Sequence, residues 1–363
     1  MKLVRTNARS VTTRIAMALA VGSVALTAAC GGSDDSSSSS PSSSGASASA
    51  AKAPELRLGY FANVTHASAV YGVASGGFQQ ALGTTKLTTS VFNAGPAAIE
   101  ALAGGAIDAA FLGPNPAITG YANSGGKLLR IVAGTTYGGS SLVVKPSITD
   151  VSQLSGKKVA TPQLGNTQDV AAKAYFKEKN VSNVTILNQD NAISLDLLKR
   201  GEIDGAWVPE PWASRLVIDG GGKQLINEST LWPAGKFVTT QLVVSQKFLA
   251  QYPGSVDDLL KGLIASTDTV SSKSPDVQKV VNDQITKDTG KGLSAAVLAA
   301  AFDNLTPTLD PVASSLAKSA KDAADVGVSK SNPDLKGIYD LAPLNKLLKA
   351  AGKPEVSDDK LGV

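Results

Sequence analysis

The sequence predicts an α/β protein built from two similar lobes, and an internal repeat is the main observation behind this prediction. Residues 102–117 read LAGGAIDAAFLGPNPA, and residues 198–213 read LKRGEIDGAWVPEPWA, with Leu, Gly, Ile, Asp and Ala in matching places. Each copy combines a helix end, a glycine turn, a short apolar strand and a proline-containing turn, as α/β units do. A repeat spaced this widely is a small domain, too long for a solenoid unit. Two such lobes predict a cleft between them.

The first lobe is expected to comprise residues 55–143 and 241–363. Short apolar runs predict its strands, at 56–60, 87–92, 107–112 and 128–135. A helix is expected from Thr65 to Phe78, and another after Pro96, because proline suits a first helical turn. Later helical patterns are predicted to pack on this lobe, at 256–265, 294–302, 312–326 and 341–351.

The second lobe is expected to comprise residues 144–240. Its predicted strands are 158–161, 184–187 and 206–208, and a helix is predicted over 167–179. The strand at 141–145 is expected to lead the chain into this lobe, and the strand at 241–245 to lead it back. The two crossings are therefore predicted near Val143–Lys145 and Thr240–Val243, where they would act as the hinge.

An export signal is expected over residues 1–29. Basic residues without an acid precede an apolar run at 15–29 that is short for a transmembrane helix. Cys30 follows at once, in a setting that resembles a bacterial lipobox, although Thr27 stands where Leu or Val is usual. It is the only cysteine, so an intrachain disulfide is impossible. We expect Cys30 to carry a lipid, and residues 30–54 to form a lipidated, serine-rich tether.

The charge of the chain gives no support to nucleic-acid binding. The formal net charge is +4, and the basic residues of the signal (Lys2, Arg5, Arg9 and Arg14) account for it, which leaves 4 − 4 = 0 for the remainder. Apolar residues make up 43% of the chain, enough to bury a full core, and the length favours two lobes over one.

The sequence offers little for catalysis. It holds one histidine and one cysteine, so no thiol nucleophile remains beside the anchor and no histidine pair can hold zinc. No Gly-x-Ser-x-Gly elbow or Gly-x-Gly-x-x-Gly fingerprint occurs, and the turn at 165–169 lacks the lysine of a phosphate-binding loop. We therefore expect a protein that is not an enzyme and uses no cofactor or metal.

Three turns are predicted to bind an anion. Each follows the carboxyl end of a strand and precedes a helix, where unpaired N–H groups and the helix dipole favour negative charge. In open α/β sheets these strand ends line the ligand crevice. The candidate ligand-binding residues at these turns are Tyr60, Asn63, His66, Gly113, Asn115, Gln163, Asn166, Thr167 and Gln168. For Asn115 and Thr167 helix capping is the alternative role, and for His66 a place at a helix start without ligand contact.

The turn after the second copy of the repeat adds Glu210 and Trp212 to the candidates. Glu210 lies between two prolines, where its carboxylate could meet a cationic or hydroxyl group of the ligand, bridge the lobes, or be solvated. Trp212 follows a strand and is placed for the cleft. Trp207 aligns with Phe111 inside a strand, so core packing is expected for it.

With these features the chain resembles the solute-binding proteins of ABC importers for aliphatic sulfonates, taurine and nitrate. The segments that carry the resemblance are 95–102, 107–116, 159–169, 207–212 and 309–316. The resemblance implies a two-lobed, type II periplasmic-binding-protein-like fold whose ligand cleft closes on a small anionic solute. It also implies delivery to an ABC permease and its ATPase by a monomer lipid-anchored at the extracytoplasmic face of the cell membrane.

The resemblance leaves the ligand open. Relatives bind nitrate, bicarbonate, sulfonates, taurine and thiamine precursors on one scaffold, and a fold does not fix a ligand. An aliphatic sulfonate or taurine is favoured, because an aminoalkane sulfonate brings an ammonium group that Glu210 would suit. The alternatives are a ligand-sensing adaptor for a membrane receptor and an enzyme on the same scaffold.

Overall fold

The computed structural model describes residues 50–363. The predicted signal sequence, Cys30 and the tether as far as residue 49 lie outside the described residues. Residues 50–363 form two β-sheets, one of six strands and one of five. The first sheet contains β1 (Glu55–Tyr60), β2 (Lys86–Val91), β3 (Ala109–Leu112), β4 (Leu129–Gly138), β10 (Val238–Ser245) and β11 (Leu305–Pro307). The second sheet contains β5 (Ser140–Val144), β6 (Lys158–Thr161), β7 (Thr185–Asn188), β8 (Gly205–Pro209) and β9 (Lys223–Asn227).

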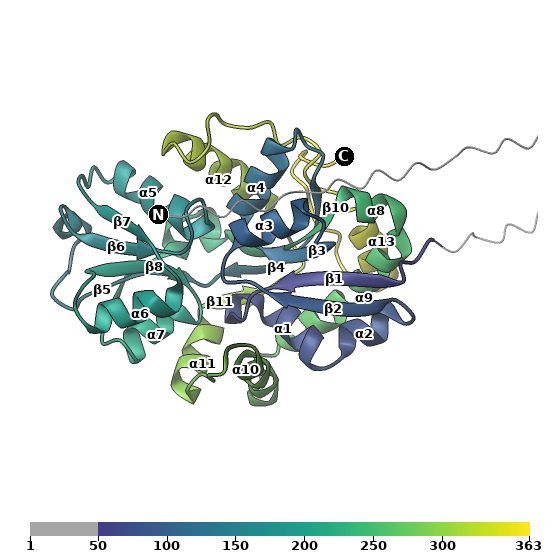
Figure 1. Ribbon diagram of the computed structural model, residues 1–363, viewed down its shortest axis with the longest axis horizontal. Coiled ribbons are helices and arrows are strands. Elements are labelled where there is room, and N and C mark those ends of the chain that lie inside the picture. The colour runs from purple at the N-terminus through teal and green to yellow at the C-terminus, as the bar shows by residue number, and fades with distance from the viewer. Residues whose placement is uncertain (1–49) are drawn as a thin grey trace, which may run out of the picture. The chain divides into compact units, whose positions relative to one another are not determined.

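Helices cover the faces of both sheets (Figure 1). In the first half of the chain these are α1 (Ala67–Ala74), α2 (Gly77–Leu82), α3 (Gly95–Ala103), α4 (Pro114–Asn123) and α5 (Thr167–Glu178). The later ones are α6 (Asn191–Lys199), α7 (Trp212–Ile218), α8 (Gln246–Gln251), α9 (Pro253–Val270), α10 (Pro275–Thr289), α11 (Ala295–Asp303), α12 (Ala313–Asp325) and α13 (Ala342–Ala350). Short 3₁₀ turns are η1 (Val64–His66), η2 (Val151–Leu154), η3 (Glu228–Leu231) and η4 (Pro233–Gly235).

The two sheets share one strand order, which explains the repeat in the sequence. The first sheet runs β11-β4-β10-β3-β1-β2, and the second, read from its other edge, runs β9-β5-β8-β6-β7. β3 and β8, the strands of the two repeat copies, therefore hold the same position. β3 pairs in parallel with β1, and β8 pairs in parallel with β6. Each also pairs antiparallel with a strand next to a crossing between the sheets, β3 with β10 and β8 with β5.

The repeated aspartates perform the same task in both sheets. Asp108 accepts a hydrogen bond from the Arg57 backbone N–H at 2.9 Å, and Asp204 accepts one from the Lys158 backbone N–H at 3.0 Å. The other carboxylate oxygen of each forms an ion pair: Asp108 with Arg57 at 2.6 Å, and Asp204 with Lys145 at 2.9 Å. Each aspartate thus fastens the loop before its strand to the start of the neighbouring strand, because one side chain satisfies a backbone donor and a charge together.

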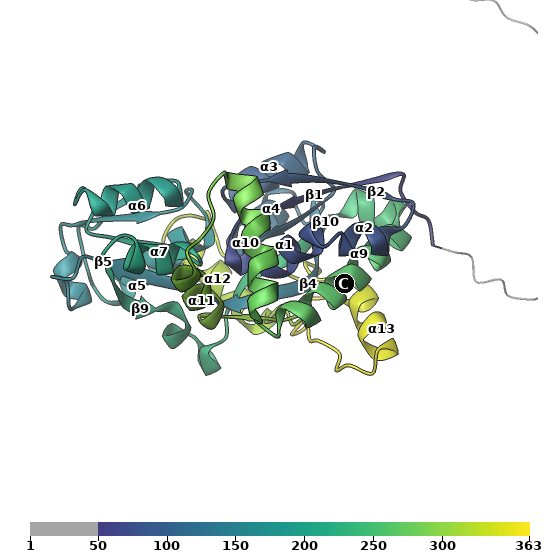
Figure 2. The ribbon, with the colours of Figure 1, turned by 90° about the horizontal axis from the view of Figure 1, so that it is seen from below.

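Alternation along the central strands of the first sheet builds a core on each face. Ala109 and Phe111 of β3 face the layer that contains α1, α2 and α9, whereas Ala110 and Leu112 face α3, α4 and α12. Successive side chains of a strand point to opposite faces, so a continuous apolar run fills both layers. Figure 2 shows α10 passing beside α1 on the first of these faces, in line with their contact.

In the second sheet the predicted core role of Trp207 is confirmed. Its side chain is fully buried and lies edge-on to Tyr175 and Phe176 of α5, at ring separations of 5.5 and 6.5 Å. The indole N–H donates to the buried Glu228 carboxylate at 2.7 Å. Burial raises the pKa of Glu228, and the hydrogen bonds to it act in the opposite direction.

The crossings between the sheets differ from the predicted ones. β5 lies wholly in the second sheet, so the chain crosses at Gly138 and Gly139, ahead of the predicted Val143–Lys145. Both glycines have φ of +74°, a conformation that other residues adopt only with strain, and this permits the sharp change of direction. The return crossing precedes Val238, because β10 already pairs with β4 at that residue, not at Thr240–Val243.

Two expectations about helices also need correction. The helix expected from Thr65 to Phe78 is interrupted: α1 ends at Ala74, and Gly76 at φ +73° precedes α2. The late helices do not all pack on the first sheet alone. α9 and α13 contact each other there, but α11 also contacts α7, and α12 contacts α5.

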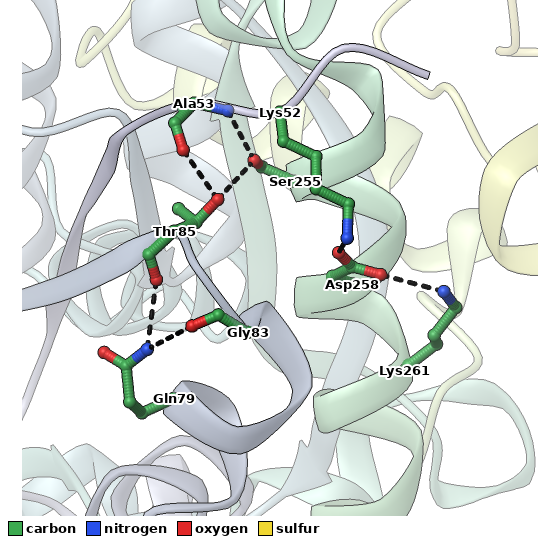
Figure 3. Close-up of polar contacts among 8 residues, drawn as sticks. All are labelled: Lys52, Ala53, Gln79, Gly83, Thr85, Ser255, Asp258 and Lys261. Atoms are coloured by element: carbon green, nitrogen blue, oxygen red, sulfur yellow. Dashed lines mark hydrogen bonds and ion pairs between the residues drawn. The ribbon is translucent and has the colours of Figure 1, made fainter. Parts of the chain in front are cut away.

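The first described residues are fastened to α9 by polar contacts, drawn in Figure 3. The Ala53 N–H donates to Ser255 Oγ at 2.8 Å, and the Thr85 hydroxyl donates to the Ala53 carbonyl at 2.7 Å. Lys52 pairs with Asp258 of α9 at 2.6 Å. We call these five residues the N-terminal clasp; they hold the chain ahead of β1 against lobe one, with the Ser255 hydroxyl buried at its centre.

Candidate functional site

A small cavity lies where strand ends of both sheets meet. Its volume is about 20 Å³, room for one or two water molecules or a compact ionic group. Asparagine, threonine, glutamine and histidine side chains supply its polar surface, and none of its lining residues carries a formal charge at neutral pH. The lining residues are Phe61, Asn63, Thr65, His66, Asn93, Gly113, Pro162, Asn166, Thr167, Gln168, Asn191, Pro209 and Thr239.

The start of α5 supplies three of the predicted residues. Asn166 is the N-cap, and its Oδ1 accepts from the Gln168 N–H at 3.1 Å. Thr167 is 6% exposed, and its hydroxyl has no hydrogen-bond partner among the described residues. The Asp169 and Val170 N–H groups both donate to the Asn166 carbonyl at 3.1 Å, so the first turn of α5 leaves the N–H and the hydroxyl of Thr167 unpaired beside the cavity. A buried hydroxyl without a partner is costly, which is a reason to expect a ligand atom or a water beside it.

His66 is a neutral donor in this cavity. Its ring stacks on Phe61 at 4.3 Å, and Nδ1 accepts from the Phe61 N–H at 3.3 Å. Burial lowers the pKa of His66 to about 3, since the charged imidazolium would lose its hydration. A neutral imidazole that accepts at Nδ1 carries its proton on Nε2. The Nε2–H group is therefore available to the cavity, and it stays uncharged throughout the physiological pH range.

Direct hydrogen bonds join the two lobes around the cavity. The Trp212 indole N–H donates to Asn63 Oδ1 at 3.1 Å, and the Ala97 N–H at the start of α3 donates to Gln163 Oε1 at 3.3 Å. Asn93 Nδ2 lies 3.4 Å from Asp190 Oδ2. The structure therefore has the lobes in contact, with the cavity between them.

Gly113 and Thr167 lie close together across the cavity. A β-carbon placed on Gly113 would overlap Thr167 Oγ1 from the other lobe. The backbone of Gly113 is extended, with φ −78° and ψ 167°, which any residue adopts. Glycine is needed here for space and not for backbone freedom.

The structure places Tyr60 and Asn115 outside the lining of this cavity. The Tyr60 hydroxyl donates to Asp288 of α10 at 2.7 Å, because the side chain points into the α10 face of the sheet. Asn115 is buried in α4, and its Nδ2 donates to the Ser319 carbonyl of α12 at 3.1 Å. Asn115 does not cap its helix either, since Gly113 is the N-cap of α4.

Glu210, Trp212 and Gln163 also lie outside the cavity lining. Glu210 is fully buried, and its carboxylate accepts hydrogen bonds from Ser214 at 3.0 Å and from Asn304, which follows α11, at 2.8 Å. This matches the alternative in which Glu210 bridges the lobes, and it excludes the alternative of a solvated carboxylate. Burial raises the pKa of Glu210, and the hydrogen bonds from Asn304 and Ser214 oppose that shift. Trp212 reaches the cavity only through Asn63. Gln163 is exposed and spans the lobes.

Several lining residues were missed in the sequence. Asn93 follows β2 and Asn191 follows β7, so the rule that polar residues after strands line the crevice would have found both. Thr239 comes from β10, which re-enters the first sheet from the other lobe, and no local pattern indicates its place.

Two further observations concern residues 50–363 only. No helix in this range combines the length and the apolar character needed to cross a bilayer. No group of three or more His, Cys, Asp or Glu side chains in the same range is arranged to hold a metal ion.

Two sheets with a common strand order and a polar cavity between their strand ends define a two-lobed α/β fold. A model of the NMT1-like family matches residues 49–283, which is more than half of the 363 residues. The chain therefore belongs to the NMT1-like family. No curated protein matches the sequence.

Solved periplasmic binding proteins share the fold. The alkanesulfonate-binding protein SsuA of Xanthomonas axonopodis pv. citri, bound to MOPS, is 22% identical; the likeness covers 77% of this chain and 94% of that one, with a TM-score of 0.65. The aliphatic sulphonate-binding protein SsuA of Escherichia coli is 19% identical over 78% and 91%, at 0.63. The nitrate-binding protein NrtA of Synechocystis PCC 6803 is 14% identical over 77% and 83%, at 0.63. The predicted fold class is confirmed.

Proposed function

We propose that the protein captures a small organic oxyanion in the cavity between its lobes and delivers it to an ABC permease with its ATPase. The observation that carries the proposal is the uncharged donor set at this cavity: the N–H and hydroxyl of Thr167 at the start of α5, and the neutral His66. Such donors bind an ionised oxygen group without a buried lysine or arginine. Membership of the NMT1-like family and the shared fold of SsuA and NrtA support this function.

Within this function, an aliphatic sulfonate or taurine is the proposed ligand. A sulfonate is ionised at every physiological pH and presents three acceptor oxygens, which suits a site made of donors. The proposal does not rest on Glu210, because Ser214 and Asn304 already occupy that carboxylate. Nitrate and bicarbonate are smaller anions that also present hydrogen-bond-accepting oxygens, so the same binding screen should include them.

Replacing Thr167 with alanine tests the site. The substitution removes a buried hydroxyl that has no partner among residues 50–363 and leaves the helix start otherwise unchanged. A hydrogen bond to a charged group is worth about 1.5–3 kcal/mol, so the affinity for ethanesulfonate or taurine should fall about tenfold to a hundredfold. Isothermal titration calorimetry measures this directly.

Thr167→Ser is the matched control, because it keeps the hydroxyl and loses only a methyl group. It should retain most of the affinity, and the unfolding temperature of both variants should stay near that of the parent. If Thr167→Ala binds every oxyanion in the screen as tightly as the parent protein does, the ligand does not bind at the start of α5.

We also propose that Cys30 carries a lipid that anchors the protein at the extracytoplasmic face of the membrane. The support is the sequence alone: an apolar run at 15–29 ends beside the single cysteine. Cys30→Ser should shift the protein from the membrane fraction to the soluble fraction of the producing cells, as followed by immunoblotting. Unchanged retention at the membrane would rule the anchor out.

A further inference from the structure

A second, larger chamber adjoins the cavity. Its volume is about 460 Å³, against about 20 Å³ for the inner cavity. The two spaces share Asn63, Asn93 and Asn191 in their walls, so these asparagines stand between them. The inner cavity has room for little more than an oxyanion head, and the shared asparagines mark the place where an organic body attached to that head would enter the chamber.

The chamber differs from the inner cavity in its chemistry. Phe92 and Trp212 give it aromatic surface, and Ile285 and Leu293 of the α10 side add aliphatic surface. Charged side chains also line it, unlike the inner cavity: Asp190, Asp196, Lys199, Arg215, Asp288 and Lys291. The chamber is thus suited to an organic body that carries both apolar and charged groups.

Asp288 is the carboxylate in this chamber whose position is best fixed. Its Oδ2 accepts from the Tyr60 hydroxyl at 2.7 Å, and its Oδ1 accepts from Gln284 Nε2 at 2.8 Å. Both donors are neutral, and no lysine or arginine among residues 50–363 pairs with Asp288 within 4.0 Å. Two hydrogen bonds hold the negative charge at the chamber wall, and nothing in the described chain neutralises it at close range.

The other charged groups of the chamber are less suited to hold a ligand. Arg215 is engaged with Asp219 at 3.2 Å and lies over the Trp212 ring at 4.5 Å. Lys199 and Lys291 are exposed, as are Asp190 and Asp196, so solvent screens their charges. Asp288 is half-buried and fixed, and an ionic contact there is correspondingly stronger.

We infer that the ligand is a zwitterion: an oxyanion head in the inner cavity, an apolar linker or ring along Phe92 and Trp212, and a protonated amine at Asp288. Tyr60 is then a positioning residue, since it orients Asp288 and does not touch the ligand. The inference rests on the proposed oxyanion function, and it adds a positive charge on the ligand that binds at Asp288 in the chamber. It predicts a body longer than that of the smallest aminosulfonates, because the head and the carboxylate lie in different compartments.

Two matched series of probes test this inference by calorimetry. One consists of ω-aminoalkanesulfonates with chains of two to six carbons, and the other of alkanesulfonates in which a methyl group replaces the ammonium. We expect the amine to improve affinity about tenfold at the chain lengths that reach Asp288. Asp288→Asn should abolish that preference and leave the alkanesulfonates bound as in the parent, which also shows that the variant is folded. Tyr60→Phe should reduce the preference without abolishing it.

Asp283→Asn is the control on the same helix, because Asp283 is exposed, pairs with Lys279 and does not line the chamber. It should leave the amine preference unchanged. The inference is overturned if no chain length shows an amine preference, or if Asp288→Asn keeps it, while sulfonates still bind. Failure of every sulfonate to bind the parent protein would instead contradict the proposed function itself.

Discussion

Replacing Gly113 with alanine should weaken oxyanion binding about a hundredfold or more, while each lobe stays folded. The added methyl group would overlap Thr167 Oγ1 of the opposite lobe. Thr167 is β-branched and begins α5, so its side chain has few alternative rotamers. The lobes must then separate, and the donors on Thr167 and His66 can no longer surround one ligand. Binding should suffer more than stability, because the overlap vanishes when the cleft opens.

A double mutant makes this prediction specific. Thr167→Ala removes the overlapping oxygen, so Gly113→Ala should cost almost nothing further in the Thr167→Ala background. The control is Gly104→Ala at the end of α3, which has an ordinary helical φ of −75° and lies outside the cavity. Additive losses in the double mutant would show that the Gly113 effect does not arise from contact with Thr167.

Acidification should destabilise the protein through His66, by about 2 kcal/mol between pH 6.5 and pH 4.5. The unfolded chain binds a proton near the ordinary pKa of 6.5, whereas burial lowers the pKa of His66 in the folded chain to about 3. Between these values the unfolded state holds one proton more. Unfolding is therefore favoured as the pH falls through this window, and the loss is complete near pH 3.

The sequence contains a single histidine, so a histidine contribution to the pH dependence of stability can be assigned to His66. Urea unfolding at pH 7.0, 5.5 and 4.5 should show a steeper fall in the free energy of unfolding for the parent protein than for His66→Gln. The difference in slope is the readout, because glutamine also removes the stacking on Phe61 and lowers stability at every pH. Parallel pH profiles for the two proteins would mean that His66 is accessible to protons in the folded state.

Sulfonate affinity, by contrast, should be almost constant between pH 8 and pH 5. The donors in the cavity are uncharged over that range, and the same low pKa that destabilises the folded chain keeps His66 in one protonation state.

The elements of this fold could be predicted well because local patterns determine them. β6 runs from Lys158 to Thr161 as predicted, and α5 begins at Thr167 as predicted, where a short apolar run, a glycine turn and Asn166 act together. The equivalence of the lobes could be read from the repeated Asp108 and Asp204, since each fastens two neighbouring strands in its own sheet.

The site was harder to predict, because the direction of a side chain at a strand end depends on packing from distant helices. Tyr60 ends its strand at the edge of the crevice, yet it faces α10, a helix more than two hundred residues later. Glu210 lies in a turn whose sequence predicts an exposed side chain, yet the side chain is buried and accepts a hydrogen bond from Asn304, 94 residues later. Neither contact leaves a periodic signal in the sequence near the residue concerned.

The N-terminal clasp determines how tension on the amino end of the domain would be carried. A force applied at residue 50 is transmitted to Ser255 and Asp258 of α9 through the contacts of Ala53 and Lys52, ahead of β1. Gly254 makes room for this route, because a β-carbon there would overlap the Ala50 carbonyl. The load thus enters a long helix packed behind the first sheet and bypasses the strand ends at the cavity. A protein held by its amino end would keep its binding geometry under strain from that attachment.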